Sequence, residues 1–479
     1  MREFYSLRLD GQSPTEELCT IAMLLEAIFN RFAKKTPITV MTRALLEYAL
    51  DPNALDALFN KYAKWQYEKK LLFSSVVNLM GVVVCRIQPS VCAAYQAVED
   101  DLSVTLTAVY DKLNGIEDNV TAELVRHVAS RLGPVVEKLG GQMPPLLPGY
   151  RVKIIDGNHL AATEHRLAVL REVKAGPLPG QSLVVLDPAL MLAIDMIPCE
   201  DGHAQERSLF TQVLERVVAR DLWIADRNFC TVSFLCGIIG RHSFFGIRQH
   251  GNFPIASCGS LRSRGRCSTG EVFEQGVTFL GEDGVSHRIR RIVVHLDKPT
   301  RDGDMEIAIL TNVPAEDADA AKIAGLYLER WTIEGLFLTL TQILDGEIPS
   351  LGYPKAALFA FAVALVSYNI ASVVRSALRA TFGHDKVEKE VSWYYVANEL
   401  QVNYGGMDVA LDDEIWEPFQ TMSAGDLAAK LKEYAGNVRL SSFKRHRRGP
   451  KKPPPPRTKY ADVPHVSTHR LLVLAGHRT

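Results

Sequence analysis

Several polar residues interrupt an apolar stretch, LYLERWTIEGLFLTLTQIL, that runs from residue 326 to residue 344. The stretch predicts one helix buried on most faces, because it lacks proline and carries Leu, Ile and Phe on nearly every side. Tyr327, Arg330, Glu334 and Thr341 then fall on one stripe of that helix. A buried acid pairs, takes up a proton or binds a metal. Glu334 is therefore either half of an ion pair with Arg330 or an acid used in chemistry.

Two further acids close apolar stretches that read as strands. Asp156 ends VKIIDGN (152–158), and Asp226 lies in DLWIADRNF (221–229). Either one alone is ordinary turn chemistry. Three carboxylates gathered at one sheet edge would repel one another unless a divalent cation lay between them. Oxygen ligands suit Mg²⁺ or Mn²⁺, and two such ions can act on both oxygens of an in-line phosphoryl transfer.

The order of elements around these acids predicts the fold. After the proline-rich boundary MPPLLPGY (143–150), SLVVLDPALMLAIDMIP (182–198) reads as two strands and ERSLFTQVLERVV (206–218) as an amphipathic helix. The stretch that contains Asp226 is the next strand, a helix follows to about residue 241, and SFFGIRQH forms another strand. Three strands, helix, strand, helix, strand is the order of an RNase H-like (retroviral-integrase-like) α/β fold with helices on both sheet faces.

Helical and β-like stretches flank this predicted core. Residues 14–140 read as helices, including one that starts at Asp51-Pro52, an apolar one at 71–84, and one at 121–139 broken or kinked at Gly133-Pro134. Residues 251–301 are Gly-rich and β-like, and 305–313 return toward the sheet. Residues 355–380 read as a buried helix and 391–440 as smaller helices.

Basic residues gather in three places. The β-like stretch carries two arginine clusters, and the tail at 443–460 has eight Lys or Arg residues, no acid and a proline run that favours disorder. In the helical region, a set of basic residues either faces DNA or forms a solvated helix face. The arginine clusters are Arg262, Arg264, Arg266 and Arg288, Arg290, Arg291, and the helical set is Lys34, Lys35, Arg43, Lys61, Lys64, Lys69 and Lys70.

Composition excludes several classes of protein. A formal net charge of −1 over 479 residues excludes a uniformly basic nucleic-acid binder but not local basic patches. The eight cysteines show no zinc-ligand spacing. We expect no signal peptide and no membrane span, because the apolar run at 356–366 is shorter than the roughly 20 residues that a span needs. The absence of GxxxxGK[ST] and GxGxxG motifs predicts no nucleotide cofactor.

The motifs resemble those of one enzyme family. The DGN at 156–158, the ADRNF at 225–229 and the Tyr327-x-x-Arg330-x-x-x-Glu334 spacing are similar to those of a DDE transposase of a bacterial insertion sequence. They are most similar to the IS-four type, the branch with a Tyr-Arg-Glu-Lys signature. The interval between Asp226 and Glu334 is long enough to hold the β insertion typical of that branch. The resemblance covers roughly residues 30 to 380.

The resemblance implies a role for each matching residue. Asp156, Asp226 and Glu334 would be the catalytic, metal-binding triad, and Tyr327 and Arg330 would hold the DNA backbone near the cleaved end. Trp331 would stack on an extruded base, unless it is a core residue, and the arginines of 262–266 would contact phosphates. His159 and Asn228 would support the two aspartates. The chain departs from the family at position 341, where Thr341 stands in place of the signature lysine.

The expected protein is a transposase that binds terminal inverted repeats as a homodimer on double-stranded DNA, cleaves and rejoins phosphodiesters with Mg²⁺ or Mn²⁺, and acts at the bacterial nucleoid in the cytoplasm. Two alternatives are a metal-dependent nuclease on the same fold and a non-catalytic, DNA-binding derivative. The predicted divisions are an N-terminal helical, DNA-binding domain (1–142), an RNase H-like core in two parts (150–250 and 305–380) around a β-rich insertion (251–304), a C-terminal helical region (381–440) and a disordered basic tail (441–479).

Overall fold

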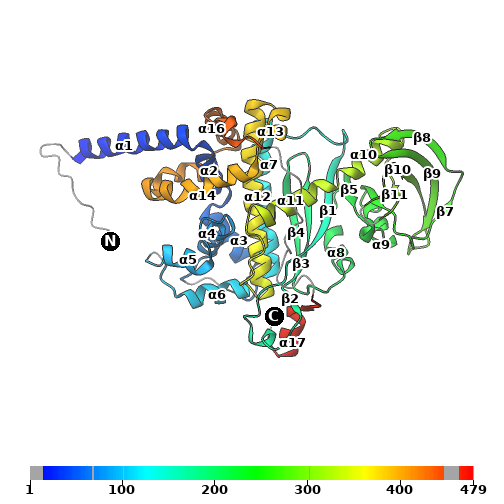
Figure 1. Cartoon of the computed structure of the whole chain (residues 1–479), viewed down its shortest axis with the longest axis horizontal. Helices are drawn as coiled ribbons and strands as arrows, with labels where there is room; N and C mark the ends of the chain where they lie inside the picture. Colours follow the sequence, from blue (N-terminus) through cyan, green and yellow to red (C-terminus); the bar gives the residue numbers. More distant parts are fainter. Residues whose placement is uncertain (1–13, 67–69, 101, 301–302, 447–462, 478–479) are drawn as a thin grey trace.

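The computed structural model describes residues 14–66, 70–100, 102–300, 303–446 and 463–477. Figure 1 shows helices on one side of the molecule, a mixed sheet on the other and the long helix α12 between them. The chain is thus a mixed α/β protein with a helical N-terminal region, as predicted.

Seven helices precede the sheet in the described part of the chain. Asp51 caps α3 as predicted, since its side chain accepts a 3.0 Å hydrogen bond from Asn53 N. The apolar stretch at 71–84 is a helix. Of the predicted break or kink at Gly133-Pro134, the break is wrong, because α7 continues through the proline; the helix ends before Gly140 (φ +68°). The helices are α1 Pro14–Lys35, α2 Pro37–Ala49, α3 Pro52–Tyr62, α4 Phe73–Val84, α5 Val91–Ala97, α6 Leu106–Gly115 and α7 Asp118–Leu139.

Arg43 does not face DNA, contrary to one of the two interpretations of the basic set. Its Nη2 lies 2.7 Å from Glu47 Oε1 and 2.9 Å from Asp413 Oδ1. Its Nη1 donates to the Tyr404 hydroxyl at 2.7 Å. Arg43 therefore ties α2 to the C-terminal helices, and Lys69 of the same set lies outside the described residues.

The central sheet places its strands in the order β4-β3-β1-β5-β6-β11-β10-β9-β7, with β8 paired to β9. Strands β4, β3 and β1 are mutually antiparallel, whereas β1, β5 and β6 are parallel neighbours. Two 3₁₀ turns, η2 and η3, and the helices α8 and α9 lie among these strands. The bounds are β1 Arg151–His159, β3 Gln181–Asp187, β4 Leu192–Cys199, η2 Glu206–Leu209, α8 Phe210–Leu214, β5 Asp221–Ala225, η3 Arg227–Phe229, α9 Val232–Ile239 and β6 Phe244–Arg248.

The order of strands and helices agrees with the prediction, but the helix predicted at 206–218 is much shorter. It consists of the turn η2 followed by the five residues of α8. Successive residues of β1 point to opposite faces of the sheet. Ile154 packs in the core formed with the N-terminal helices and α12, whereas Ile155 packs in the core formed with α8 and α9. Helices therefore cover both faces of the sheet.

The predicted β-rich stretch forms strands that extend the same sheet. β10 pairs with β9 and β11, and β11 returns to pair with β6. Figure 1 shows these strands at the end of the molecule farthest from the N-terminal helices. The bounds are β7 Ala256–Ser257, β8 Arg262–Cys267, β9 Gly270–Leu280, β10 Ser286–Leu296 and β11 Glu306–Thr311.

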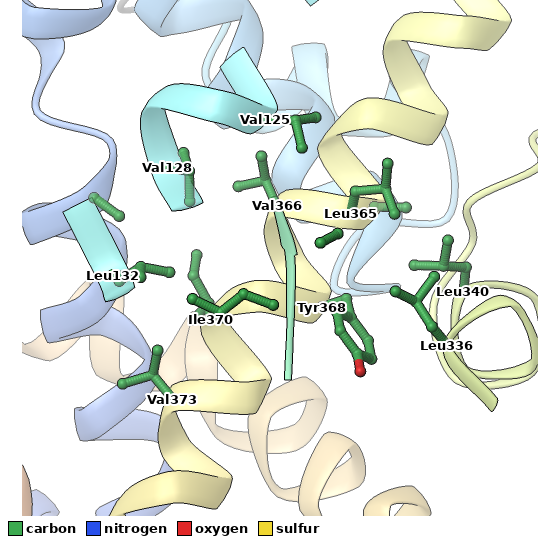
Figure 2. Close-up of a cluster of buried hydrophobic side chains, with 14 of the residues drawn as sticks. Val125, Val128, Leu132, Leu336, Leu340, Leu365, Val366, Tyr368, Ile370 and Val373 are labelled. Carbon is green, nitrogen blue, oxygen red and sulfur yellow. The ribbon is translucent and has the colours of Figure 1, made fainter. Parts of the chain in front are cut away.

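The helix predicted at 326–344 is two helices, α10 (Ala320–Leu328) and α11 (Trp331–Gln342). Hydrogen bonds spaced by three residues join them, from Glu329 N to Leu326 O and from Arg330 N to Tyr327 O. The expectation that the stretch is buried on most faces is also wrong, because α11 buries only one face. Figure 2 shows that face, where Leu336 and Leu340 point toward Leu365 and Tyr368 of α12.

Helix α12 (Pro354–Phe382) is the buried helix predicted at 355–380. It is long and apolar enough to cross a membrane, but 94% of its most apolar window is buried inside the protein. Its neighbours in the core include Val125, Val128 and Leu132 of α7 (Figure 2). Such burial identifies α12 as the central core helix.

Smaller helices follow, as predicted for 391–440: α13 His384–Glu390, α14 Trp393–Ala410, α15 Glu417–Gln420 and α16 Ala424–Gly436. The predicted disordered tail is partly ordered. Strand β12 (His465–Ser467) pairs with β2 (Gly176–Leu178), and helix α17 (Thr468–Leu474) buries Leu472. Those few apolar residues anchor the end of the chain, whereas the basic residues 447–460 lie outside the described residues.

Candidate active site

Asp156 and Asp226 lie at one edge of the sheet because of the register of two parallel strands. The last pair between β1 and β5 is Ile154 with Ile224, and each aspartate follows two residues later, Asp156 within β1 and Asp226 directly after the end of β5. Residues two apart on a strand share a face, and neighbouring strands lie about 4.8 Å apart. The two carboxylates therefore lie on the same side of the sheet, but the prediction that Asp156 ends its strand is wrong, because β1 continues to His159 in its pairing with β3.

Tyr327 connects α10 to the second of these aspartates. Its ring is buried, with 4% of the residue exposed. The hydroxyl donates a 3.1 Å hydrogen bond to Asp226 Oδ1. Burial, and next the charge of Asp226, raise the pKa of the Tyr327 phenol well above its ordinary value, so the hydroxyl stays a donor at neutral pH.

Arg330 lies in the break between α10 and α11 and joins the other two acids. Its Nη1 donates to Asp156 Oδ2 at 2.9 Å, and its Nη2 donates to Glu334 Oε1 at 3.0 Å. The Arg330 side chain is 12% exposed and that of Glu334 is 51% exposed. The ion pair suggested by the sequence therefore exists, and it is part of the site.

The charge of Asp156 is costly in this place. Burial raises the pKa of its carboxyl to about 6, although Arg330 and the Gly157 N–H oppose the shift. The negative charges of Asp226 and Glu206 raise it further. Such a carboxylate favours a neighbouring cation.

The donor chemistry of Asp156, Asp226 and Glu334 fits a hard divalent ion, because all three offer carboxylate oxygens. The three side chains are spaced more widely than the ligands of a bound metal ion. Within the described ranges, no three His, Cys, Asp or Glu side chains lie close enough together to hold a metal ion. Arg330 takes one oxygen each of Asp156 and Glu334, and Asp226 connects to the group through Tyr327.

Trp331 and Thr341 are both exposed residues of α11. Trp331 is 65% exposed, so it is not a core residue. The Thr341 hydroxyl donates to Phe337 O of its own helix at 3.1 Å. His159 is exposed beyond Asp156, while Asn228 donates to Glu206 rather than to an aspartate.

The arginines of β8 are exposed, and β8 lies against α10. Two of them are ion-paired: Arg264 lies 2.8 Å from Glu274, and Arg266 donates to both oxygens of Asp297 at 2.7 Å. Arg262 has no ion-pair partner among the described residues. Of the three, Arg262 is therefore the most available to an external phosphate.

Part of the second predicted cluster is structural. Arg290 is held by Glu274 Oε1 at 2.6 Å and by the Val313 and Ala318 carbonyls at 2.9 and 2.8 Å. Arg291 donates to Gln249 Oε1 at 2.7 Å. Arg290 therefore braces the strands against the segment that leads into α10.

Two residues near the site carry no signal in the sequence. Arg248 ends β6, the third parallel strand, and donates to Asp304 Oδ2 at 2.6 Å. Burial opposes its charge, yet Asp304, Tyr327 and Asp226 together raise its pKa. Glu206 lies close to Asp156 from the start of η2. Both belong to elements that only the folded sheet brings together.

The comparisons with known proteins agree with this site. Residues 148–370, just under half of the chain, match a family described as "Transposase DDE domain". The matched region begins just before β1 and ends within α12, so it includes the sheet edge and both site helices. No curated protein matches the chain. Residues 148–370 therefore match the transposase DDE family, which is the family that the motifs of the chain resemble.

Proposed function

We propose that this protein is a DNA transposase that binds the terminal inverted repeats of its own insertion sequence, cuts at the element ends and joins them to target DNA. One observation carries the proposal. Asp156 lies in β1 and Asp226 directly follows the adjacent parallel strand β5, while Arg330 bonds both Asp156 and Glu334 and Tyr327 bonds Asp226. A family match over the same residues gives independent support.

The topology supports an RNase H-like core. Three antiparallel strands followed by two parallel ones, in the order β4-β3-β1-β5-β6, have helices on both faces. Strands β7 to β10 come between β6 and the helix that carries Tyr327, as expected for an insertion at 251–304 in a core of 150–250 and 305–380. The Tyr327, Arg330 and Glu334 spacing supports the IS-four branch.

Asp156, Asp226 and Glu334 would hold one or two Mg²⁺ or Mn²⁺ ions. When bound, such ions stabilise charge that develops on the phosphate and activate water for attack. Arg330 supplies positive charge between Asp156 and Glu334, which keeps the two acids close despite their repulsion. Water would attack the phosphodiester to free a 3′-OH, and that hydroxyl would then attack target DNA without a covalent enzyme intermediate.

DNA would lie along the exposed side of α11 and the neighbouring β8. Arg330 suits a phosphate because its planar fork can bind two oxygens, and Tyr327 offers a hydroxyl donor. The exposed Trp331 would stack on an unpaired base. Thr341, Arg262, Arg264 and Arg266 would extend the backbone contacts.

The partners follow from this chemistry. The protein would bind double-stranded DNA as a homodimer on paired ends, at the nucleoid in the bacterial cytoplasm, with no nucleotide cofactor and no membrane. The N-terminal helices (1–142) would contribute to DNA binding, and the C-terminal region (381–440) would pack behind them.

The test is a cleavage and joining assay on DNA that carries the inverted repeats flanking the gene, with Mg²⁺ or Mn²⁺. We expect wild-type protein to nick the ends and form joined products. Asp156→Asn, Asp226→Asn and Glu334→Gln should abolish both reactions and leave end binding intact. Nicks without joining on any sequence would favour the nuclease, and end binding without nicks would favour the non-catalytic derivative.

A further inference from the structure

The side chain of Glu206 lies between strand β1 just after Asp156 and the η3 turn just after Asp226. On one side, its Oε2 accepts a 3.3 Å hydrogen bond from Nδ2 of Asn228, two residues after Asp226. On the other side, its Oε1 occupies the space beside Gly157, the residue after Asp156. One carboxylate therefore contacts both the β1 and the β5 ends of the site.

The contact at Gly157 leaves no space for a side chain while Glu206 keeps its position. A β-carbon built on Gly157 would lie 2.0 Å from Glu206 Oε1, far inside any real contact distance. The backbone of Gly157 is not in the left-handed region, so its conformation does not itself require a glycine. Any side chain at position 157 would push the Glu206 carboxylate away.

Packing fixes the position of Glu206. Four residues further along the chain, the Phe210 ring stacks on Phe229, with ring centroids 5.0 Å apart. Phe229 ends the η3 turn and is fully buried. Since η2 and η3 also contact each other directly, the segment that carries Glu206 lies against the turn that follows Asp226.

The negative charge of Glu206 is energetically unfavourable at this position, so its presence suggests a function. A third carboxylate placed next to Asp156 and Asp226 adds repulsion to a site that is already acidic. A buried or half-buried acid with no cation of its own is normally removed from such a place, unless it orients its neighbours or attracts a cation. Among the described residues, Glu206 forms no ion pair.

We propose that Glu206 is a positioning residue, whose carboxylate is packed against Gly157 of β1 and bonded to Asn228 of η3 and so sets the spacing of Asp156 and Asp226 for a divalent ion. The inference rests on the proposed function, since it assigns Glu206 a part in that site. Residues that orient metal-binding carboxylates commonly change metal affinity or activity by about 10- to 100-fold when they are removed. A Gln side chain keeps the volume and an oxygen acceptor for Asn228, so it should keep most of the effect.

The experiment measures Mn²⁺ affinity by electron paramagnetic resonance on the full-length protein without DNA, together with melting temperature and DNA end binding. We expect Glu206→Ala to weaken Mn²⁺ binding about 10-fold or more, with end binding unchanged. Glu206→Gln should stay within about threefold of wild type. Glu215→Ala, at an exposed acid of the same segment, is the matched control and should behave as wild type.

Gly157→Ala tests the same contact from the other side. It should reduce Mn²⁺ affinity as Glu206→Ala does, because its methyl group displaces the carboxylate. The double variant Gly157→Ala/Glu206→Ala should bind Mn²⁺ no more weakly than the single variant with the lower affinity, since both changes remove the same interaction. If Glu206→Ala fails to fold, Gly157→Ala and Glu206→Gln still decide the question.

Two results would overturn the inference. Wild-type Mn²⁺ affinity in Glu206→Ala would show that the contacts of Glu206 with Gly157 and Asn228 do not affect metal binding. An equal loss of affinity in Glu206→Gln would show that the charge of Glu206, not its positioning effect, matters. The proposed function is tested separately. Cleavage by wild type together with an idle Glu206 would refute only this inference, whereas the expected Mn²⁺ pattern in a protein that never cuts DNA would refute only the transposase.

Discussion

Arg330 donates a 2.9 Å hydrogen bond to Asp156, so a residue between two helices reaches the central strand of the sheet. The same guanidinium bonds Glu334 at 3.0 Å. It therefore contacts both of these acids directly. Its planar fork suits two carboxylates here and a phosphate when DNA is present.

Arg330→Ala should weaken binding to element ends about 10-fold or more, because a charge-assisted hydrogen bond contributes roughly 1.5–3 kcal/mol. Arg330→Lys should fall between wild type and Arg330→Ala, since an ammonium cannot form the fork. Fluorescence anisotropy with labelled end DNA in Ca²⁺ measures both. Arg166→Ala, at an exposed pair with Glu164, is the control and should have no effect. End binding of Arg330→Ala at wild-type strength would assign Arg330 to the structure alone.

The β8 arginines should contribute unequally to DNA binding. Arg262 has no ion-pair partner in the described part of the chain, whereas Arg266 is held by both oxygens of Asp297. We expect Arg262→Ala to reduce the slope of log affinity against log salt by roughly 0.9, the value for one lost phosphate contact. Arg266→Ala should make the salt dependence less steep by a smaller amount. Asp297→Ala should free Arg266 and make the salt dependence steeper. Equal, unchanged slopes in all three variants would mean that β8 does not touch DNA.

Much of the site could be predicted because its signals are local. Asp156 and Asp226 each follow the apolar residues of a strand, and Arg330 and Glu334 lie four residues apart in one motif. The break after Leu328 could not be predicted, since no proline or glycine marks it and the three-residue hydrogen bonds depend on packing. Glu206 and Arg248 were missed for a related reason. Their roles come from contacts across the sheet edge, and neither residue has a motif of its own.

The same limit explains the wrong predictions. Arg43 and Arg290 look like free basic residues in the sequence, yet each meets acids or carbonyls that are distant along the chain. Trp331 lies in an apolar stretch, but α11 packs on α12 through one face only, which leaves the tryptophan outside. Composition indicates which residues can be buried. Which face of a helix is buried depends on the element that packs against it.

Asp118 should make the stability of the protein depend on pH. It lies in the first turn of α7 with Oδ1 inaccessible and unbonded among the described residues. Burial, and next the charge of Glu200, raise the pKa of its carboxyl to about 7, while Lys355 opposes the shift. The folded state therefore binds this proton more tightly than the unfolded chain, whose Asp pKa is about 4. Stability from this group falls as pH rises through the window from about 4 to 7.

Asp118→Asn removes that cost. We expect it to raise the free energy of unfolding by about 1–3 kcal/mol at pH 8, and the gain should shrink below pH 7 and vanish near pH 4. Urea unfolding at several pH values measures this. Asp111→Asn, at an exposed position of α6, is the control and should show no such trend. A gain that is the same at every pH would mean that the titration of Asp118 does not contribute.

Thr341 is the position where the chain departs from the Tyr-Arg-Glu-Lys signature. It lies seven residues after Glu334 on the same helix, so the two share a face. Its side chain is exposed and bonds only its own helix backbone, which excludes the alternative that it packs in the core. A lysine there should therefore be tolerated by the fold and reach a phosphate of DNA bound along α11.

We expect Thr341→Lys to keep the melting temperature of wild type and to tighten end binding by roughly fivefold, since an exposed charged contact contributes about 1 kcal/mol. The salt slope should steepen by roughly 0.9. Gln342→Lys is the matched control, because it adds the same charge one residue later, about 100° around the helix. Equal gains in both variants would indicate general attraction to DNA. Tighter binding in Thr341→Lys alone would indicate that the bound strand lies along the helix face that Thr341 shares with Glu334. Tighter binding in neither variant would indicate that DNA does not lie along α11.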